Sequence, residues 1–237
     1  MDKYITNKRP LTTLFMLMSL DGKISTGKSE NLDVDKDFPE IRGIAEGLYQ
    51  YYELEQNTDL HSLNTGRVQA KIGANKKKDA IKTPVNFIII DNKPHLTENG
   101  VQYLMNKSKK LFLITTNKLH PAFHISMPEN LEIIYYENTI DFKDLFYKFK
   151  SVYDIEAITI QSGGTLNSVL LRQGLIDYVS IVIAPCLIGG KDTPTIIDGE
   201  SFSMETEIKE IKTLELKTCK TLNNSYIHLK YKVNNTI

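Results

Sequence analysis

The sequence has no tryptophan, two cysteines, eight prolines and no excess of either charge. The two cysteines, Cys186 and Cys219, are too few for a disulfide framework, which favours a reducing, cytoplasmic location. Basic and acidic residues number 29 each, so the chain lacks the positive field that attracts nucleic acid or an anionic membrane surface. We therefore expect neither kind of partner.

Membrane-length hydrophobic runs and metal-ligand patterns are also missing. The first apolar run, residues 11–20, is too short to span a membrane and lacks the features of a secretory signal; it predicts a buried strand. The five histidines form no ligand pattern with the cysteines, and His120 and His124 enclose Pro121, which disfavours the helix that such a pair needs. We expect no metal site. No serine-histidine-aspartate set can be assembled from the spacing either.

From residue 85 onward, apolar strands alternate with short amphipathic helices, which predicts parallel βαβ units. The predicted strands are 86–90, 111–115, 131–135, 156–161 and 178–184, and the predicted helices are 98–107, 142–152 and 165–173. Alternating runs at 208–216 and 226–233 flank Asn223-Asn224, which predicts an antiparallel C-terminal hairpin. The expected fold is α/β, with a mixed, mainly parallel sheet flanked by helices. The absence of a linker favours a single domain over residues 1–237.

Two regions are less regular. Asp37, followed by Pro39 and by a glutamate three residues on, fits a capping box and predicts a helix that begins there. Gly43 and Gly47 weaken this helix, so we expect both to be points of close packing. Residues 53–82 are too polar for a core element, and they read equally well as a binding loop or as a solvated connection.

The segment 160–174 carries the clearest candidate site. An apolar strand enters Ser162-Gly163-Gly164 and passes directly into a helix that begins with Thr165 and Leu166. Glycines let a ligand approach the backbone, and the free N–H groups at a helix N-terminus suit an anionic phosphate. The segment is neither a G-x-G-x-x-G fingerprint nor a Walker A loop, and plain turn chemistry is the alternative interpretation.

Two further strand ends could carry chemistry. The run 17–25 delivers Asp21 and Lys23 at the end of the first strand, where ligands sit in α/β sheets; an Asp-Gly turn with a solvated lysine is the alternative. The run 183–194 also ends in a glycine pair. Nothing in the sequence marks Cys186 as a nucleophile, so we expect an inert, buried thiol.

Together these motifs carry a resemblance to a known family. Residues 18–24, 162–166 and 174–190 resemble, in the same order, the reductase domain of the riboflavin-biosynthesis deaminase/reductase, and the resemblance covers nearly the whole chain. It implies a dihydrofolate-reductase-like fold and a homodimer. It also implies a reductase that uses NADPH to convert the ribosyl group of a small phosphoribosylamino-pyrimidine into a ribityl chain.

The resemblance also implies roles for individual residues. It assigns the cofactor phosphates to Ser162, Gly163, Gly164, Thr165 and Leu166, and the adenosine half to Thr115 and Thr116. Asp21 and Lys23 would border the nicotinamide and the substrate, and they are the candidates for catalytic groups. Gly73 would bind cofactor, and Asn64, Thr65, Gly66 and Arg67 would contact substrate, in a region where the family's usual pattern is not reproduced.

The chain departs from the family in other places. Ser162 stands where the family often has glutamate, Tyr178 where it has a second acidic residue, and Phe15 where a lysine is common. Three other functions therefore stay open: a dihydrofolate-type reductase, a non-catalytic nucleotide-binding module, and a structural or protein-interaction domain. Sensitivity to methotrexate would identify a dihydrofolate-type reductase. Cofactor binding without turnover would identify a nucleotide-binding module, and absence of dinucleotide affinity would identify a structural or interaction domain.

Overall fold

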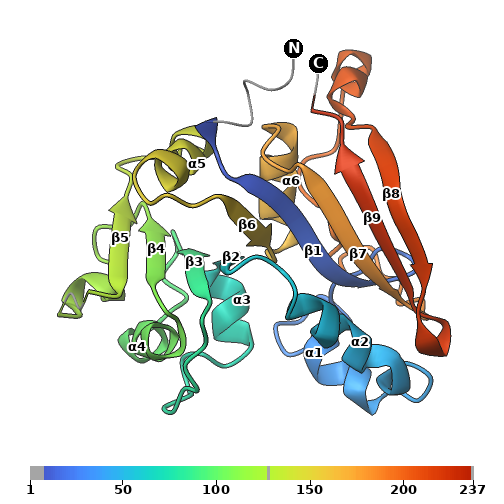
Figure 1. Cartoon of the computed structure of the whole chain (residues 1–237), viewed down its shortest axis with the longest axis horizontal. Helices are drawn as coiled ribbons and strands as arrows, with labels where there is room; N and C mark the ends of the chain where they lie inside the picture. Colours follow the sequence, from blue (N-terminus) through green and yellow to red (C-terminus); the bar gives the residue numbers. More distant parts are fainter. Residues whose placement is uncertain (1–7, 127–128, 236–237) are drawn as a thin grey trace. The chain divides into compact units, whose positions relative to one another are not determined.

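The computed structural model describes residues 8–126 and 129–235, and the chain forms two compact units (Figure 1). Unit 1 contains the described residues up to Leu11 together with Asp59–Ser162. Unit 2 contains Thr12–Thr58 and the described residues from Gly163 onward. The chain therefore enters unit 2 early, crosses to unit 1 and returns to unit 2 through the Ser162-Gly163 peptide.

Unit 1 is built on a parallel sheet in the order β5-β4-β3-β2-β6. Its strands are β2 (His61–Thr65), β3 (Asn86–Ile90), β4 (Leu111–Thr115), β5 (Leu131–Tyr135) and β6 (Ala157–Ile160). Because all five strands run in one direction, their carboxyl ends lie at one edge of the sheet. In the central strands nearly every side chain is buried, which explains the continuous apolar runs in the sequence.

Helices cover both faces of this sheet. On one face α4 (Glu98–Lys107) packs Val101 and Leu104 against Ile89 and Leu113. On the other face Phe149 of α5 (Phe142–Ser151) makes an edge contact with a ring of β4. The side chains of Thr97 and Asp141 cap α4 and α5 by accepting hydrogen bonds from backbone N–H groups of the first turn. The remaining helices of unit 1 are α3 (Gly66–Lys71) and the short 3₁₀ helix η3 (Pro121–His124).

Unit 2 contains the mixed part of the fold. Strand β1 (Leu11–Ser19) pairs in parallel with β7 (Tyr178–Ala184), which pairs antiparallel with β9 (Ile227–Val233), and β9 pairs antiparallel with β8 (Leu214–Thr221). The chain turns between β8 and β9 at η5 (Asn223–Ser225), where Asn224 has φ +55°. The expected mixed, mainly parallel sheet with an antiparallel C-terminal hairpin is confirmed.

The helix expected from Asp37 is wrong in its start. A short helix α1 (Val34–Asp37), capped by Asp33, is followed by the 3₁₀ helix η2 (Phe38–Glu40), and α2 (Ala45–Glu55) begins only afterwards. Gly43, with φ +88° and open space around it, breaks the helical path rather than packing closely.

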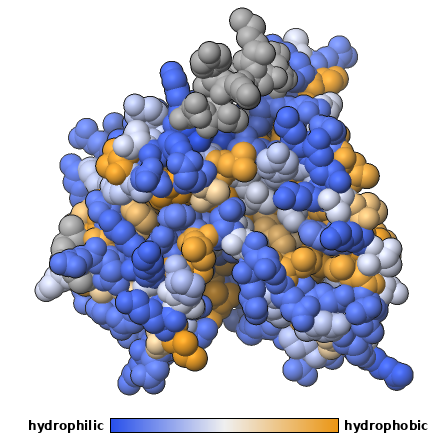
Figure 2. Space-filling model, viewed as in Figure 1, coloured by the Kyte–Doolittle hydropathy of each residue, from blue (hydrophilic) through white to orange (hydrophobic). Residues whose placement is uncertain are grey.

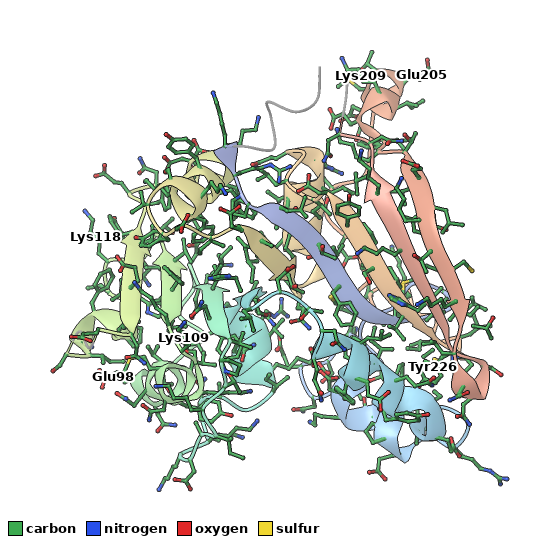
Figure 3. All side chains as sticks on the ribbon, in the orientation of Figure 1. Glu98, Lys109, Lys118, Glu205, Lys209 and Tyr226 are labelled. Carbon is green, nitrogen blue, oxygen red and sulfur yellow. The ribbon has the colours of Figure 1, made fainter. Side chains whose placement is uncertain are left out.

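Gly47 does pack closely, as expected. A Cβ atom there would lie 2.6 Å from the ring of Tyr226, whose hydroxyl donates a hydrogen bond to the Ile44 carbonyl at 2.8 Å. Tyr226 is fully buried and is labelled in Figure 3 at the start of β9. These contacts attach α2 to the C-terminal hairpin.

Two other expectations are corrected. Residues 53–82 are not one polar loop, because they include β2 and α3; Leu63 is fully buried in β2, and backbone pairing on both sides compensates for the strand's polar composition. The strand expected at 208–216 begins only at Leu214, since η4 (Glu205–Glu210) occupies the preceding residues. Within the described part of the chain, no helix is long and apolar enough to cross a membrane.

Candidate functional site

The turn after β1 holds the two candidate catalytic side chains, and both are engaged by one loop. The Asp21 carboxylate accepts hydrogen bonds from the backbone N–H groups of Gly189 at 2.6 Å and Ile188 at 3.1 Å. The Lys23 ammonium donates to the carbonyls of Gly190 at 2.8 Å and Thr193 at 3.0 Å. These contacts tie the turn to the loop that follows β7.

The pKa of Asp21 is lowered to about 2, mainly by the hydrogen bond from the Ser19 hydroxyl; burial raises this pKa, and the N–H groups of Gly189 and Ile188 lower it. Asp21 is therefore ionised at neutral pH. An acid that donates a proton efficiently has a pKa near the working pH. In this geometry Asp21 is suited to holding the loop and not to donating a proton.

The same loop reaches the start of α6 (Gly164–Arg172). Asp198 donates its backbone N–H to the Gly164 carbonyl at 3.1 Å, and Asn167 donates its side-chain amide to the Ile196 carbonyl at 2.9 Å. Ile196 in turn donates to the carbonyl of Gly22 in the turn after β1. Unit 2 thus joins the Asp21 turn, the loop and the N-terminus of α6 in one hydrogen-bonded assembly.

The two glycines at the start of α6 differ in their surroundings. A Cβ atom on Gly164 would lie 2.2 Å from the Thr195 carbonyl oxygen, so this position admits no side chain. A Cβ atom on Gly163, the N-cap residue, would meet no atom within 4 Å. No side chain caps the helix, and the first N–H groups of any helix lack internal partners. This end of α6 has the space and the donors that a phosphate group requires.

The other residues expected at the cofactor phosphates lie around this end. Thr165 is exposed and Leu166 is half-buried in the first turn of α6. Ser162 is buried and is the last residue of unit 1, whereas Gly163 is the first residue of the return to unit 2. The predicted phosphate segment therefore spans the connection between the units.

The candidate substrate residues of unit 1 lie at the carboxyl end of β2. Thr65 caps α3 by accepting the N–H of Val68 at 3.3 Å, and Asn64 accepts the N–H of Thr65 at 2.7 Å. Gly66 is buried, and a Cβ atom on it would lie 2.2 Å from the carboxyl carbon of Asp91. Arg67 is exposed. The segment is a strand end and a helix start, not the binding loop or solvated connection that its polarity suggested.

Asp91, at the carboxyl end of β3, organises this edge of unit 1. Its side chain is fully buried and accepts four hydrogen bonds: from Nε2 of His120 at 3.1 Å, from Nδ1 of His95 at 2.8 Å, and from the backbone N–H groups of His95 and Leu96. Burial raises the pKa of Asp91, but these hydrogen bonds outweigh it and hold the pKa below its usual value.

The residues expected near the adenosine are attached to the same place. The Thr115 hydroxyl donates to the Asp91 carbonyl at 2.9 Å, and the N–H of Thr116 donates to the Asn92 side chain at 3.0 Å. Gly73 has a different role, since its φ of +94° turns the chain at the end of α3. The structure thus brings Thr65, Gly66, Thr115 and Thr116 to one edge of unit 1 and leaves Gly73 at the far end of α3.

Sequence reasoning missed Asp91, His95 and His120. The available signal was the position of Asp91 directly after an apolar strand, because the carboxyl ends of parallel strands are the usual ligand edge. No sequence pattern connects His95 or His120 with Asp91, and the spacing of His120 pointed only to a pair with His124. Although one carboxylate and two imidazoles meet here, no group of three or more side chains in the described residues could hold a metal ion.

One departure from the family pattern, at Phe15, has a structural explanation. Phe15 is buried and stacks on Tyr51 with ring centroids 5.1 Å apart, so a lysine there would bring a charge into the core between β1 and α2. Cys186 is half-buried, and burial, with a smaller effect of Asp21, raises the pKa of its thiol. The thiol is therefore less buried than expected, and its low reactivity stays a prediction that the raised pKa supports.

Comparison with known proteins agrees with this arrangement. The profile of the RibD C-terminal domain matches residues 10–227. The chain belongs to the RibD C-terminal domain family. A relative from Methanothermobacter thermautotrophicus, a 2,5-diamino-6-ribosylamino-4(3H)-pyrimidinone 5′-phosphate reductase, is 27% identical over 236 residues, which cover 92% of this chain and 96% of the relative.

Two further matches extend the comparison. A reductase of the same name from Archaeoglobus fulgidus is 23% identical and covers 87% of this chain and 94% of its own length. The structure of Acinetobacter baumannii RibD matches with a TM-score of 0.64 at 16% identity and indicates a shared fold. The match covers 96% of this chain but 59% of that RibD chain, so this chain corresponds to somewhat more than half of it.

Proposed function

We propose that this chain is an NADPH-dependent pyrimidine reductase of riboflavin biosynthesis, which reduces the ribosyl group of a phosphoribosylamino-pyrimidine to a ribityl chain. The observation that carries the proposal is the match of the reductase domain family over residues 10–227. The full-length similarity to relatives named as reductases supports it. A dihydrofolate-type reductase is disfavoured by these names, and insensitivity to methotrexate would exclude it.

The N-terminus of α6 supports the assignment of a nicotinamide dinucleotide as cofactor. Gly163 leaves open space there, Gly164 holds the backbone against the loop, and the first turn offers free N–H groups. Thr165 and Leu166 complete that turn. Thr115 and Thr116, fixed to the Asp91–Asn92 turn, are assigned to the adenosine half. The bound cofactor would supply the hydride.

In this proposal the protein mainly positions two ligands and excludes water. Asp21 and Lys23 act by fixing the loop that follows β7, which borders both the strand-end turn and the start of α6. Backbone groups of that loop bind both the carboxylate and the ammonium. We assign them to ligand positioning, and Asn64, Thr65, Gly66 and Arg67 to the substrate.

Two substrates fit the proposed reaction. The family resemblance points to the aminouracil, 5-amino-6-(5-phosphoribosylamino)uracil, whereas the archaeal relatives are named for the diamino-pyrimidinone, which still carries its second amine. Measuring kcat/KM for both compounds with NADPH and with NADH would identify the preferred pair. Turnover of neither compound, despite cofactor binding, would favour a non-catalytic nucleotide-binding module.

The cofactor assignment is tested by titrating the protein with NADPH and NADH while following nicotinamide fluorescence. In Gly163→Asp a carboxylate enters the open space and should repel the phosphates, so we expect NADPH affinity to fall by at least about tenfold, equivalent to ~1.4 kcal/mol. Gln173→Glu is the matched control, because it adds the same charge at the exposed opposite end of α6. Failure of the wild type to bind either nucleotide would reject the proposed function.

We also propose a cytoplasmic homodimer that binds neither nucleic acid nor membrane. The dimer is supported by the exposed edge strand β8, where Leu214 and Leu216 are 47% and 52% exposed. Hydrophobic surface is visible on the side of the molecule where β8 lies (Figure 2). An exposed apolar edge strand is normally covered by another chain or blocked by charge.

A further inference from the structure

His95 is held in one position by contacts on both sides of its backbone. Its N–H and its Nδ1 both bond to the buried Asp91 carboxylate, at 3.2 Å and 2.8 Å. Its carbonyl accepts the side-chain amide of Asn75 at 2.8 Å, and the same Asn75 side chain accepts the N–H of Thr97 at 3.0 Å. The loop between β3 and α4 is therefore rigid at His95.

The contact with Asp91 fixes which nitrogen of His95 carries hydrogen. Asp91 has a lowered pKa and is ionised, so it can only accept, and Nδ1 of His95 must donate. In the neutral ring Nε2 is then an acceptor. The side chain is 37% exposed, and Nε2 has no hydrogen-bond partner among the described residues.

The neighbouring histidine on the same carboxylate is satisfied at both nitrogens. His120 accepts the N–H of Ala122 at Nδ1 and donates from Nε2 to Asp91, and its side chain is fully buried. His120 therefore completes a structural network. His95 uses the same carboxylate to hold an imidazole at the surface with one acceptor unused, which a structural role alone does not require.

The position of His95 is where a ligand of this sheet is expected. The loop follows β3, between the ends of β2 and β4, and the carboxyl edge of a parallel sheet is the usual ligand edge. Thr116 and Gly66, assigned above to cofactor and substrate, contact the same Asp91–Asn92 turn. A ligand group that meets an imidazole acceptor here must be a donor. Both proposed ligands carry N–H donors on their bases as well, and the ribose hydroxyls are the donors whose contribution can be tested by removing them from either ligand.

The geometry points to His95 as a ligand-binding residue whose Nε2 accepts a hydrogen bond from a ribose hydroxyl of the cofactor's adenosine or of the ribosyl substrate. This inference rests on the proposed function. Asp91 is the positioning residue, since it holds the ring and its tautomer without touching the ligand. Asn75 fixes the backbone from the other side.

The test pairs His95→Asn with ligands that lack the hydroxyl. Asparagine can keep a donor near the position of Nδ1, and therefore the bond to Asp91, but it removes the outer acceptor. His124→Asn is the matched control, because Nδ1 of His124 also bonds to a carboxylate, that of Glu98 (labelled in Figure 3), at a surface site in the same unit. The melting temperature of each variant reports whether the fold is kept.

Dissociation constants are measured by calorimetry for AMP against 2′,3′-dideoxyadenosine 5′-monophosphate and for ribose 5-phosphate against 2-deoxyribose 5-phosphate. We expect the wild type and His124→Asn to prefer the hydroxylated member of one pair by about tenfold, the size of one good hydrogen bond. His95→Asn should bind both members of that pair equally. The pair that responds identifies the source of the ribose.

The inference is overturned if the wild type shows no preference in either pair, or if the preference persists in His95→Asn. A parallel NADPH titration separates this failure from that of the proposed function. If NADPH binds and His95→Asn keeps the preference for the hydroxylated ligand, only the proposed role of His95 is rejected. Absence of binding for NADPH and all four probes removes both.

Discussion

The carboxylate of Asp21 accepts the backbone N–H of Gly189 at 2.6 Å, and this contact joins the turn after β1 to the loop after β7. Lys23 repeats the connection from the same turn with the opposite charge, through the carbonyls of Gly190 and Thr193. The turn after β1 therefore fixes the position of the loop after β7, and substitutions in this turn should change activity.

Asp21→Asn should lower activity by loosening the loop and not by removing a proton donor. The loss of kcat/KM should stay below about 100-fold, the lower end of the range for acid–base catalysis. The pH–rate profile should keep its shape, because a carboxyl with a pKa of about 2 does not titrate near neutral pH. Lys191→Gln, an exposed change in the same loop, should have no effect. If the pH–rate profile of Asp21→Asn instead lost its acidic or its basic limb, Asp21 would have to act as a catalytic acid or base.

Asp91→Asn should destabilise the protein by about 2–4 kcal/mol, since an amide cannot accept from all four donors and leaves a buried polar group unpaired. The lowered pKa of Asp91 also sets a pH dependence. Its stabilising contribution is complete above the unfolded-state pKa near 3.8 and is lost as the pH falls below it. Urea unfolding between pH 7 and pH 3 measures both effects. An Asn variant with the same acid sensitivity as the wild type would contradict this assignment.

Gly164→Ala and Gly163→Ala should have opposite consequences. The first places a methyl group 2.2 Å from the Thr195 carbonyl and should cost about 1–3 kcal/mol of stability by overpacking. The second meets open space at a φ of −71°, so stability should be unchanged while NADPH affinity falls. Thermal melts and fluorescence titrations of both variants check the pair. Equal melting temperatures would show that the loop yields around Gly164.

The two thiols should differ in reactivity. Burial raises the pKa of Cys186 and limits both its thiolate fraction and its access, whereas Cys219 is exposed on β8. In protein dilute enough to be monomeric, so that β8 is uncovered, we expect iodoacetamide to label Cys219 first at pH 7.5. Mass spectrometry of the digested protein measures the two rates. Faster labelling of Cys186 would mean that the loop around Asp21 opens readily.

Leu216→Glu should dissociate the proposed homodimer. The residue is exposed near the middle of edge strand β8 and pairs with Tyr231 of β9. A charge there should oppose association while the fold is kept. Light scattering after size exclusion gives the mass of each form. Lys209→Glu, an exposed change in η4 outside the strand, is the control.

The core of the fold could be predicted because its strands are buried on both faces. Residues 86–90 and 111–115 are continuous apolar runs, and the structure has strands at these same positions. Strand β2 was missed because its sequence, His61 to Thr65, is polar, and pairing with β3 and β6 on both sides gives it the order that its composition does not. The break at Gly43 was missed because a positive φ is not visible in a helical pattern.

The candidate site could be predicted only where it is local in sequence. The segment from Ser162 to Leu166 is one strand end and one helix start, so the donors at α6 followed directly. The Asp91 network joins residues 4 and 29 positions away on the chain, and no periodicity connects them. Nor could the sequence reveal that Asp21 and Lys23 bond to a loop some 170 residues distant.

The backbone N–H groups of His95 and Leu96 lie in a loop but point at an ionised carboxylate with no exposed surface. In the folded protein these hydrogen-bond donors take the place of water around Asp91. Either amide hydrogen can exchange with solvent only when the loop opens locally, and that opening removes some of the donors from Asp91. These two loop amides should therefore exchange almost as slowly as those of the neighbouring strands. The loop would then belong to the cooperative unit of the molecule that opens most slowly. During folding it would take up its native conformation only when the parallel sheet has formed.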